Sequence, residues 1–342
     1  MRHKKLTTSL IAVLLLGCIA LASYIHITNG VFDISVKDVL KTILGFEDDE
    51  RFKLVIFEFR LPRIIIAAIV GVGLALAGVV LQGITRNPLA DPGILGINAG
   101  AGTAIVLFMF FFQIQVVQAD IQNWLAVMMM PIFGFVGGGL AAAIIFSFAY
   151  KQKRLDMQRL ILTGIAINSG FSALSLFFSL KMNASDFEAA AVWMNGSIYN
   201  ADWMFIWTIL PWVVILAIYI FYKAHLLDYF QLGEENMISL GIKTESEKRK
   251  LMIASVGLVS ACVSVSGSIG FIGLMAPHIA KQLVGNHHRS VVIISALMGA
   301  FLLIFADFIG KTVFAPLELS VGIVVSIIGI PYFLYLLIKT KA

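Results

Sequence analysis

Few residues in this sequence have types and spacings that could support chemistry. Gly310, Lys311 and Thr312 match the end of a phosphate-binding loop, but that motif also needs a preceding strand and a glycine at the position of Phe305. No residues form the pattern of a catalytic triad or of paired catalytic acids. We therefore expect no enzyme, no cofactor and no nucleotide site in this chain, so any ATP must be hydrolysed by a partner.

Three histidines are candidate metal ligands. His287 and His288 are adjacent, which is a poor arrangement for one metal ion and favours a solvated loop. His278 follows a proline near a helix break, where a structural hydrogen bond is the expected role. We predict no metal site.

Polar residues inside apolar runs are functional candidates because they are costly in a membrane. Asp307 lies near the end of one run and Glu318 precedes another. Asp307 could pair with Lys311, four residues further on. Asn98 and Asn168 lie within runs, where hydrogen bonding between helices is favoured over a role in a transport path.

The composition predicts a membrane protein. Of 342 residues, 59% are hydrophobic and only 13% are charged, and the mean hydropathy is +0.93. A soluble chain carries about 25% charged residues. The net charge of +5 comes from short basic clusters between apolar runs, a pattern typical of membrane topology and not of nucleic-acid binding.

The apolar runs predict about ten transmembrane helices in an all-α bundle, because each run is continuously apolar instead of alternating. Residues 251–285 are too long for one helix, and Gly267, Gly270, Gly273 and Pro277 predict a break between two short ones. A cleaved signal peptide is the alternative for the first run, but its length favours an uncleaved helix. The predicted spans are 7–27, 62–83, 93–112, 124–149, 159–180, 203–222, 251–267, 270–285, 291–310 and 320–338.

Basic residues orient these spans. In the ten-span arrangement 17 of the 25 lysines and arginines lie on the side of the termini and 8 on the other, so both termini are expected in the cytoplasm. The external segment is then about 28–60, with a short amphipathic helix at 36–44. The main cytoplasmic segment is about 223–250, where a capping box predicts a short helix from Thr244. We expect residues 1–342 to form a single membrane domain.

Small residues four apart recur along the spans, at Gly71 and Ala75, Gly96 and Gly100, and Gly134 and Gly138. Such spacing lets helices approach closely. Ordinary packing within the bundle is favoured over a specific dimer motif.

Four motifs together carry a resemblance. Arg60-Leu61-Pro62-Arg63 opens the second span, and residues 82–96 read QGITRNPLADPGILG. Residues 267–278 read GSIGFIGLMAPH, and a Gly-x-x-His-Arg loop occupies 285–289. In this order and spacing, over nearly the whole chain, they resemble the iron–siderophore and cobalamin permease family (FecCD type) of ABC importers.

The resemblance implies ten helices per subunit, a second permease subunit (a copy or a paralogue) around a central path, two cytoplasmic ATPase subunits and an external substrate-binding protein. It also implies roles for single positions. Arg60 and Arg63 match arginines that dock the binding protein, and Lys311 stands where relatives have a third arginine, keeping the charge but not the bidentate geometry. The loop Asn87-Pro88-Leu89 matches the cytoplasmic gate. Residues 232–248, with Gly233, Glu234 and Gly241, match the ATPase-coupling segment.

The expected function is import of an iron–siderophore-type chelate across the cytoplasmic membrane of a bacterium. Cobalamin or haem is the alternative cargo, and the sequence does not choose among them. A secondary transporter with Asp307 or Glu318 carrying protons is a further alternative. A buried acid with a strongly shifted pKa would favour it, whereas an exposed acid in a mouth loop would not.

Overall fold

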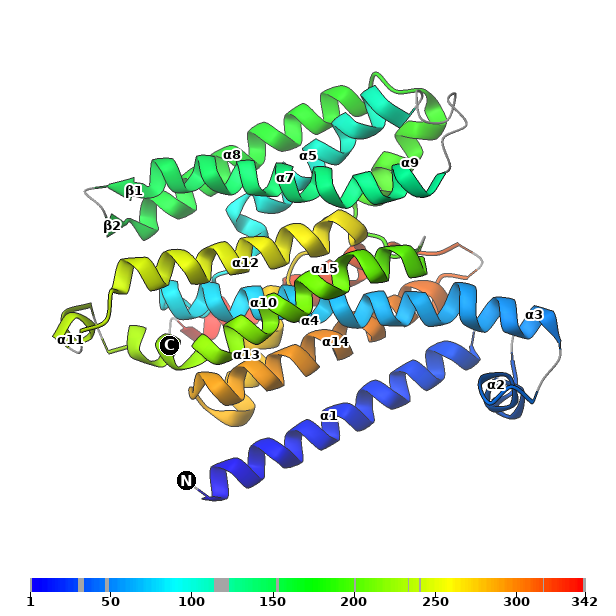
Figure 1. Ribbon diagram of the computed structural model, residues 1–342, viewed down its shortest axis with the longest axis horizontal. Coiled ribbons are helices and arrows are strands. Elements are labelled where there is room, and N and C mark those ends of the chain that lie inside the picture. The colour runs from blue at the N-terminus through cyan, green and yellow to red at the C-terminus, as the bar shows by residue number, and fades with distance from the viewer. Residues whose placement is uncertain are drawn as a thin grey trace.

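The computed structural model describes residues 2–29, 34–46, 49–113, 123–151, 154–199, 201–232, 234–239, 241–315 and 317–340. These residues are helical apart from turns, loops and one antiparallel pair of two-residue strands (Figure 1). The elements are α1 (Arg2–Thr28), α2 (Val36–Ile43), α3 (Glu50–Lys53), the π-helix η1 (Leu54–Arg60), α4 (Leu61–Thr85), the 3₁₀ helix η2 (Pro92–Leu95), α5 (Ile97–Phe108), the π-helix η3 (Met109–Gln113), α7 (Asn123–Ala149), β1 (Tyr150–Lys151), β2 (Arg154–Leu155), α8 (Met157–Ser179), α9 (Ala184–Met194), α10 (Trp203–Phe230), α11 (Glu234–Ser239), α12 (Thr244–Ser266), α13 (Ile272–Val284), α14 (His288–Thr312) and α15 (Val321–Thr340).

The predicted all-α transmembrane bundle is confirmed. In the described part of the chain, eight helices are long and apolar enough to cross a membrane, and a shorter apolar helix covers Ile97–Phe112. Helix α13 has only 13 residues, about 20 Å at 1.5 Å per residue, which is less than a hydrocarbon core of about 30 Å. The count of ten spans therefore stays a prediction.

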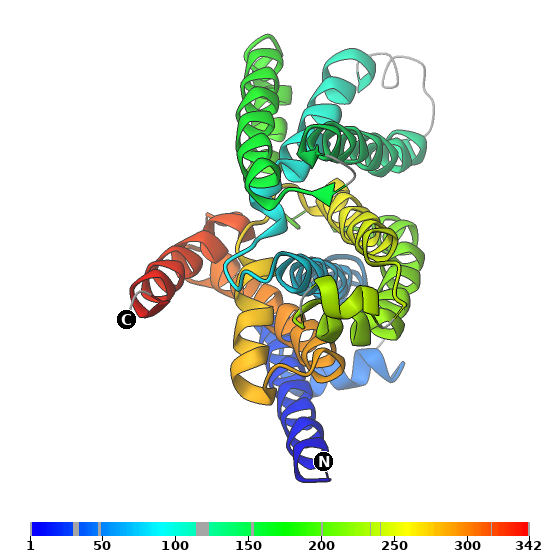
Figure 2. The ribbon, with the colours of Figure 1, turned by 90° about the vertical axis from the view of Figure 1, so that its left-hand side faces the viewer.

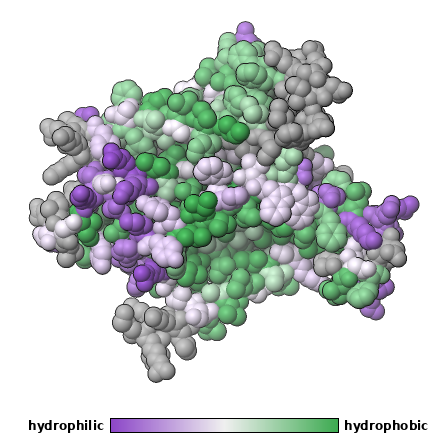
Figure 3. All heavy atoms as spheres, viewed as in Figure 1, coloured by the Kyte–Doolittle hydropathy of each residue, from purple (hydrophilic) through white to green (hydrophobic). Residues whose placement is uncertain are grey.

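A band of apolar side chains separates two hydrophilic ends of the molecule (Figure 3). Figure 1 places both chain ends at the same end of the bundle as α11, with α2, α3 and α9 at the opposite end. This arrangement agrees with an even number of crossings. Which end faces the cytoplasm stays a prediction from the basic residues.

Helix α4 lies at the centre of one half of the bundle, where α10, α12, α13 and α14 pack around it (Figure 2). It begins earlier than expected, because α3, η1 and α4 form one helical run over Glu50–Thr85. At 36 residues this run is longer than a membrane crossing needs, so its first turns can lie outside the membrane, and the external segment of about 28–60 with a span from Pro62 stays a prediction. A π-helical turn leads into Pro62, whose missing N–H needs no partner near the start of α4.

Glycines allow the central helices to approach one another. A methyl group on Gly78 of α4 would overlap the carbonyl oxygen of Gly273 in α13, and one on Gly71 would overlap that of Gly299 in α14. Gly138 of α7 packs on Ser260 of α12 in the same way. The small residues therefore serve packing within this chain, as the favoured interpretation stated.

The predicted break after the seventh span is confirmed. Helix α12 ends at Ser266 and α13 begins at Ile272. Gly267 turns the chain with a φ of 67°, where a side chain would also strike the carbonyl oxygen of Trp193. Phe271 also has a positive φ, 63°, and its ring lies against Gly329 of α15.

Two further local predictions have different outcomes. The amphipathic helix near 36–44 is present as α2. A helix begins at Thr244 as predicted, but it is the long α12 and there is no capping box. Thr244 is already inside the helix and its hydroxyl bonds to the carbonyl of Ile242, so the capping-box prediction is wrong.

Candidate functional site

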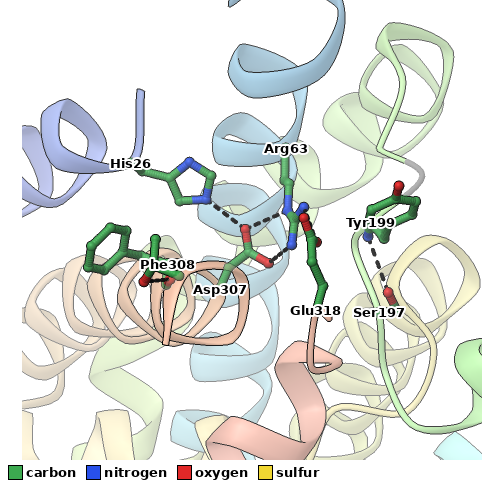
Figure 4. A network of polar contacts seen from close by, with 8 residues as sticks. His26, Arg63, Ser197, Tyr199, Asp307, Phe308 and Glu318 are labelled. Atoms are coloured by element: carbon green, nitrogen blue, oxygen red, sulfur yellow. Dashed lines mark hydrogen bonds and ion pairs between the residues drawn. The ribbon is translucent and has the colours of Figure 1, made fainter. Parts of the chain in front are cut away.

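Four ionisable side chains form a buried cluster at the end of the bundle that carries α2, α3 and α9 (Figure 4). Arg63 of α4 donates two hydrogen bonds to Asp307 of α14, from Nε to Oδ2 at 2.7 Å and from Nη2 to Oδ1 at 2.8 Å. Its Nη1 donates to Glu318 Oε2 at 2.7 Å, and His26 Nε2 of α1 lies 2.8 Å from Asp307 Oδ2. We call these four residues the outer ionic cluster, after the predicted orientation of this end of the bundle.

The outer ionic cluster is nearly closed to solvent. The side chains of His26 and Asp307 are 0% and 2% exposed, that of Arg63 is 9% exposed, and that of Glu318 is 27% exposed. Glu318 is thus the member that faces outward. Because charges held this far from water interact strongly, each depends on its partners remaining in place.

The cluster corrects one prediction. Asp307 does not pair with Lys311 along its own helix, because the planar guanidinium of Arg63 reaches both carboxylate oxygens from the neighbouring α4. Lys311 is half-buried and makes no ion pair with any described residue. The sequence did not indicate His26, because a single histidine in the first apolar run gives no signal for a partner in α14.

Both arginines of the Arg-Leu-Pro-Arg motif contact neighbouring segments of the chain. Arg60 is 4% exposed and donates from Nη1 to the carbonyl oxygen of Ile27 at the end of α1. Arg63, taken as a whole residue, is 7% exposed, and its guanidinium carbon lies 5.6 Å from the ring centre of Tyr199, in the loop before α10. In this structure both guanidinium groups therefore contact other segments of the same chain.

The Asn87-Pro88-Leu89 loop is a tight turn after α4. The Asn87 side-chain oxygen accepts a bond from the Leu89 N–H at 2.9 Å, and the Ala90 N–H closes the turn on the Asn87 carbonyl at 3.2 Å. Leu89 packs against an apolar cluster of Leu274, Met275 and Leu336. The predicted gate loop thus packs on the apolar cluster that α13 and α15 form together.

Asp91 connects this loop to the break between α12 and α13. Its Oδ1 accepts from the Gly93 N–H at 2.7 Å, and its Oδ2 accepts from the Phe271 N–H at 3.1 Å. Pro92 and the Leu74 carbonyl both lie where a methyl group on Gly273 would stand. The chain therefore turns back beside α4 before α5 begins. Sequence reasoning missed Asp91, although an aspartate before Pro-Gly is a turn signal.

Polar contacts continue below this junction. Gln82 of α4 donates to the carbonyl of Leu274 at 3.2 Å and accepts from Lys281 at 3.1 Å. His278 is hydrogen bonded to the Tyr332 hydroxyl at 2.6 Å, which confirms its expected structural role. Asn98 reaches Ser268 at 3.5 Å, and its buried Oδ1 has no hydrogen-bond partner among the described residues.

The predicted coupling segment is described in part. Gly233 lies outside the described residues, and Glu234 is the first residue of α11. Gly241 forms an exposed turn with a φ of 74°. The structure thus places two of the three residues at the end of the bundle where both chain termini lie.

The histidine pair at that end was only half predicted. His287 is exposed, as expected of a solvated loop, but His288 is 0% exposed and its Nδ1 bonds to Asp228 Oδ1 at 2.7 Å. The prediction of a solvated His288 is wrong because Asp228, a partly exposed residue at the end of α10, pairs with the buried imidazole. In the described residues no group of three or more His, Cys, Asp or Glu is placed to hold a metal ion.

Comparison with known families identifies the chain. The model of the FecCD transport family matches residues 15–339. The chain belongs to the FecCD transport family. The iron-uptake system permease protein FeuC of Bacillus subtilis (strain 168) is 48% identical over 96% of this chain and 97% of its own length. The iron(3+)-hydroxamate import system permease protein FhuG of the same organism is 45% identical over 94% and 95%.

A solved structure of a metal-chelate type ABC transporter in an inward-facing conformation shares the fold. Its TM-score is 0.81 at 28% identity, over 96% of this chain and 99% of that one. Because the match covers nearly the whole of both chains, the FecCD family protein has the fold of an ABC transporter permease.

Proposed function

We propose that this FecCD family protein is the permease subunit of an ABC importer for an iron–siderophore-type chelate in the cytoplasmic membrane of a bacterium. The carrying observation is the family match over residues 15–339, together with relatives named for iron uptake that align over almost their whole length. The family match and the ABC transporter fold support ATPase and permease partners, and in the proposed assembly these are two ATPase subunits and a second permease subunit.

Uptake by the reconstituted transporter tests this proposal. Proteoliposomes would carry the permease and its ATPase, with the binding protein and ATP supplied on opposite sides. We expect accumulation of ⁵⁵Fe given as a ferric hydroxamate or catecholate, and none with an ATPase variant that cannot hydrolyse ATP. Equal uptake without ATP would refute the proposal.

Haem is the alternative cargo that a comparison supports. The hemin transport system permease protein HmuU of Yersinia pestis is 35% identical over 82% of this chain. The iron-uptake relatives are more similar and align over more of the chain, which favours a siderophore. Competition by unlabelled hemin or cobalamin in the same assay distinguishes the cargoes.

An ion-coupled secondary transporter is less well supported. Its candidate proton carriers, Asp307 and Glu318, both bond to the guanidinium of Arg63. An acid that cycles through protonation inside a membrane must lose that compensation at each turn. The family match also assigns the fold to ATP-driven transporters.

Docking of a binding protein at Arg60, Arg63 and Lys311 is part of the proposal. Glu318, the most exposed member of the outer ionic cluster, already occupies one side of Arg63. We infer that a carboxylate of the binding protein replaces Glu318 on that guanidinium. Glu318→Gln should then strengthen binding, and Lys311→Glu should weaken it in a salt-dependent way. Unchanged affinity in both variants would leave these residues a structural role only.

The gate and coupling roles complete the proposed mechanism. The Asn87-Pro88-Leu89 loop would close the path where it packs on α13 and α15, and α11 with Gly233, Glu234 and Gly241 would receive the ATPase. Glu234→Arg should uncouple ATP hydrolysis from uptake while the permease still inserts. Asn286→Arg, in an exposed turn before α14, is the control. Unchanged uptake in Glu234→Arg would refute the coupling role.

A further inference from the structure

A groove of about 350 Å³ lies between α7 and α12 near β1. Its walls are largely apolar and include Ala143 and Phe146 of α7 and Met252 and Ile253 of α12. Ile253 is 62% exposed, so this surface is open to whatever surrounds the bundle. Because the chain spans a membrane, an open apolar groove on its side lies within reach of lipid acyl chains.

One end of the groove is polar and cationic. Arg249, in the second turn of α12, and Tyr150 of β1 both line it there. These residues lie at the end of α12 that also carries α11, where the hydrophilic surface of the molecule begins (Figures 1 and 3). Arginine and tyrosine at this level are the residues that meet lipid headgroups.

Arg249 is exposed and, unlike the lysines around it, has no ion-pair partner among the described residues. Lys248 pairs with Glu245 at 3.0 Å, and Lys223 and Lys250 pair with Glu247 at 2.8 and 2.9 Å. The nearby carboxylates are thus already compensated. Burial and the Glu245 carboxylate raise the pKa of Tyr150, which keeps its hydroxyl uncharged. The groove therefore presents one free positive charge above an apolar wall.

We propose that this groove binds an anionic phospholipid, with an acyl chain along Phe146, Met252 and Ile253 and the phosphate on Arg249. A second apolar groove serves as an internal comparison. It lies between α1, α10 and α14 over α4, has a volume of about 650 Å³, and is lined entirely by uncharged side chains such as Leu16, Phe221 and Val292. That groove should accept lipids without regard to headgroup charge, whereas the groove at Arg249 selects for it.

Native mass spectrometry of the full chain with phosphatidylglycerol and phosphatidylcholine tests the proposal. We expect phosphatidylglycerol to bind more tightly, and Arg249→Ala to weaken its binding about fivefold, which is the effect of one cation near a lipid surface. Arg289→Ala is the matched control, because Arg289 is an exposed arginine at the same end but outside the groove. Ala143→Phe should fill the groove from an exposed position and reduce binding without disturbing the core.

Phosphatidylglycerol with a photoactivatable acyl chain locates the site. Crosslinks to peptides containing Phe146 or Met252, lost in Ala143→Phe, support the proposal. Equal weakening by Arg249→Ala and Arg289→Ala would show a general effect of surface charge and overturn it. Loss of the crosslinks when the ATPase is assembled on the permease would show that the groove is a subunit contact, which also overturns it.

Discussion

Removing the positive charge of Arg63 should destabilise the protein more than the loss of an exposed arginine does. In Arg63→Met the carboxylate of Asp307, whose side chain is 2% exposed, keeps only His26 as a partner among the residues that the structure describes. Breaking one side of a buried ion pair costs about 3–5 kcal/mol. The unfolding equilibrium constant should therefore rise by two to four orders of magnitude, at about 1.4 kcal/mol per factor of ten.

A second substitution should restore part of the stability that Arg63→Met loses. Adding Asp307→Asn to Arg63→Met removes the stranded charge and leaves an amide oxygen for His26. The double variant should be more stable than Arg63→Met alone, with a coupling of about 2–3 kcal/mol. Arg51→Met, at an exposed position in α3, is the control and should have no measurable effect.

Unfolding in mixed micelles with increasing dodecyl sulfate, followed by the fluorescence of the five tryptophans, measures this cycle. If unfolding is irreversible, initial unfolding rates give the same ranking. Asp307→Asn lowering stability equally in the wild-type and Arg63→Met backgrounds would refute the reasoning. The measurement also separates two reasons for a loss of uptake in Arg63→Met, which are loss of binding-protein docking and loss of folded permease.

Three further predictions follow from the packing and the topology. Gly78→Ala should lower the Tm or prevent folding, because its methyl group meets the backbone of Gly273, whereas Gly139→Ala, with no atom of a described residue within 4 Å of the added carbon, should not. Asp91→Ala should cost about 1–3 kcal/mol for each of the two N–H groups that it leaves unpaired, and Asp91→Asn less, when unfolding is measured as above; equal losses would point to charge and not hydrogen bonding. In a Cys18→Ser, Cys262→Ser background, a membrane-impermeant thiol reagent should label Asp186→Cys from outside but not His287→Cys, and the reverse result would overturn the assigned orientation.

The helices themselves were predictable because each is a long, continuously apolar run, which has few structural solutions in a bilayer. The break at Gly267 was predictable for a similar reason, since one helix over residues 251–285 would exceed the membrane. The residues at which helices begin were harder to predict. The run from Glu50 into α4 contains charged residues and a proline, and only packing around η1 shows that the helix continues.

Partners of the buried charges were the weakest part of the sequence interpretation. Asp307 and Arg63 are 244 residues apart, and His26 and Asp307 are 281 apart. A sequence without an alignment shows only near neighbours, so Lys311 was the natural but wrong partner for Asp307. The same limit applies to the buried His288, whose partner Asp228 lies 60 residues away. In each case the tertiary fold, and not local spacing, selects the pair.

The arrangement of these contacts places α4 between the two ends of the molecule. Arg63, near its beginning, holds the outer ionic cluster, while Gln82, near its end, contacts α13 and is followed directly by the Asn87-Pro88-Leu89 loop. Close glycine packing against α13 and α14 leaves α4 little freedom to bend alone, because interiors packed this closely transmit displacement. A change of partner at Arg63 would therefore displace α4 as a rigid unit, and α13 would move with it because it packs on Gly78. Asp91, which fixes the start of α13 to the loop after α4, would make the gate and the broken helix move together.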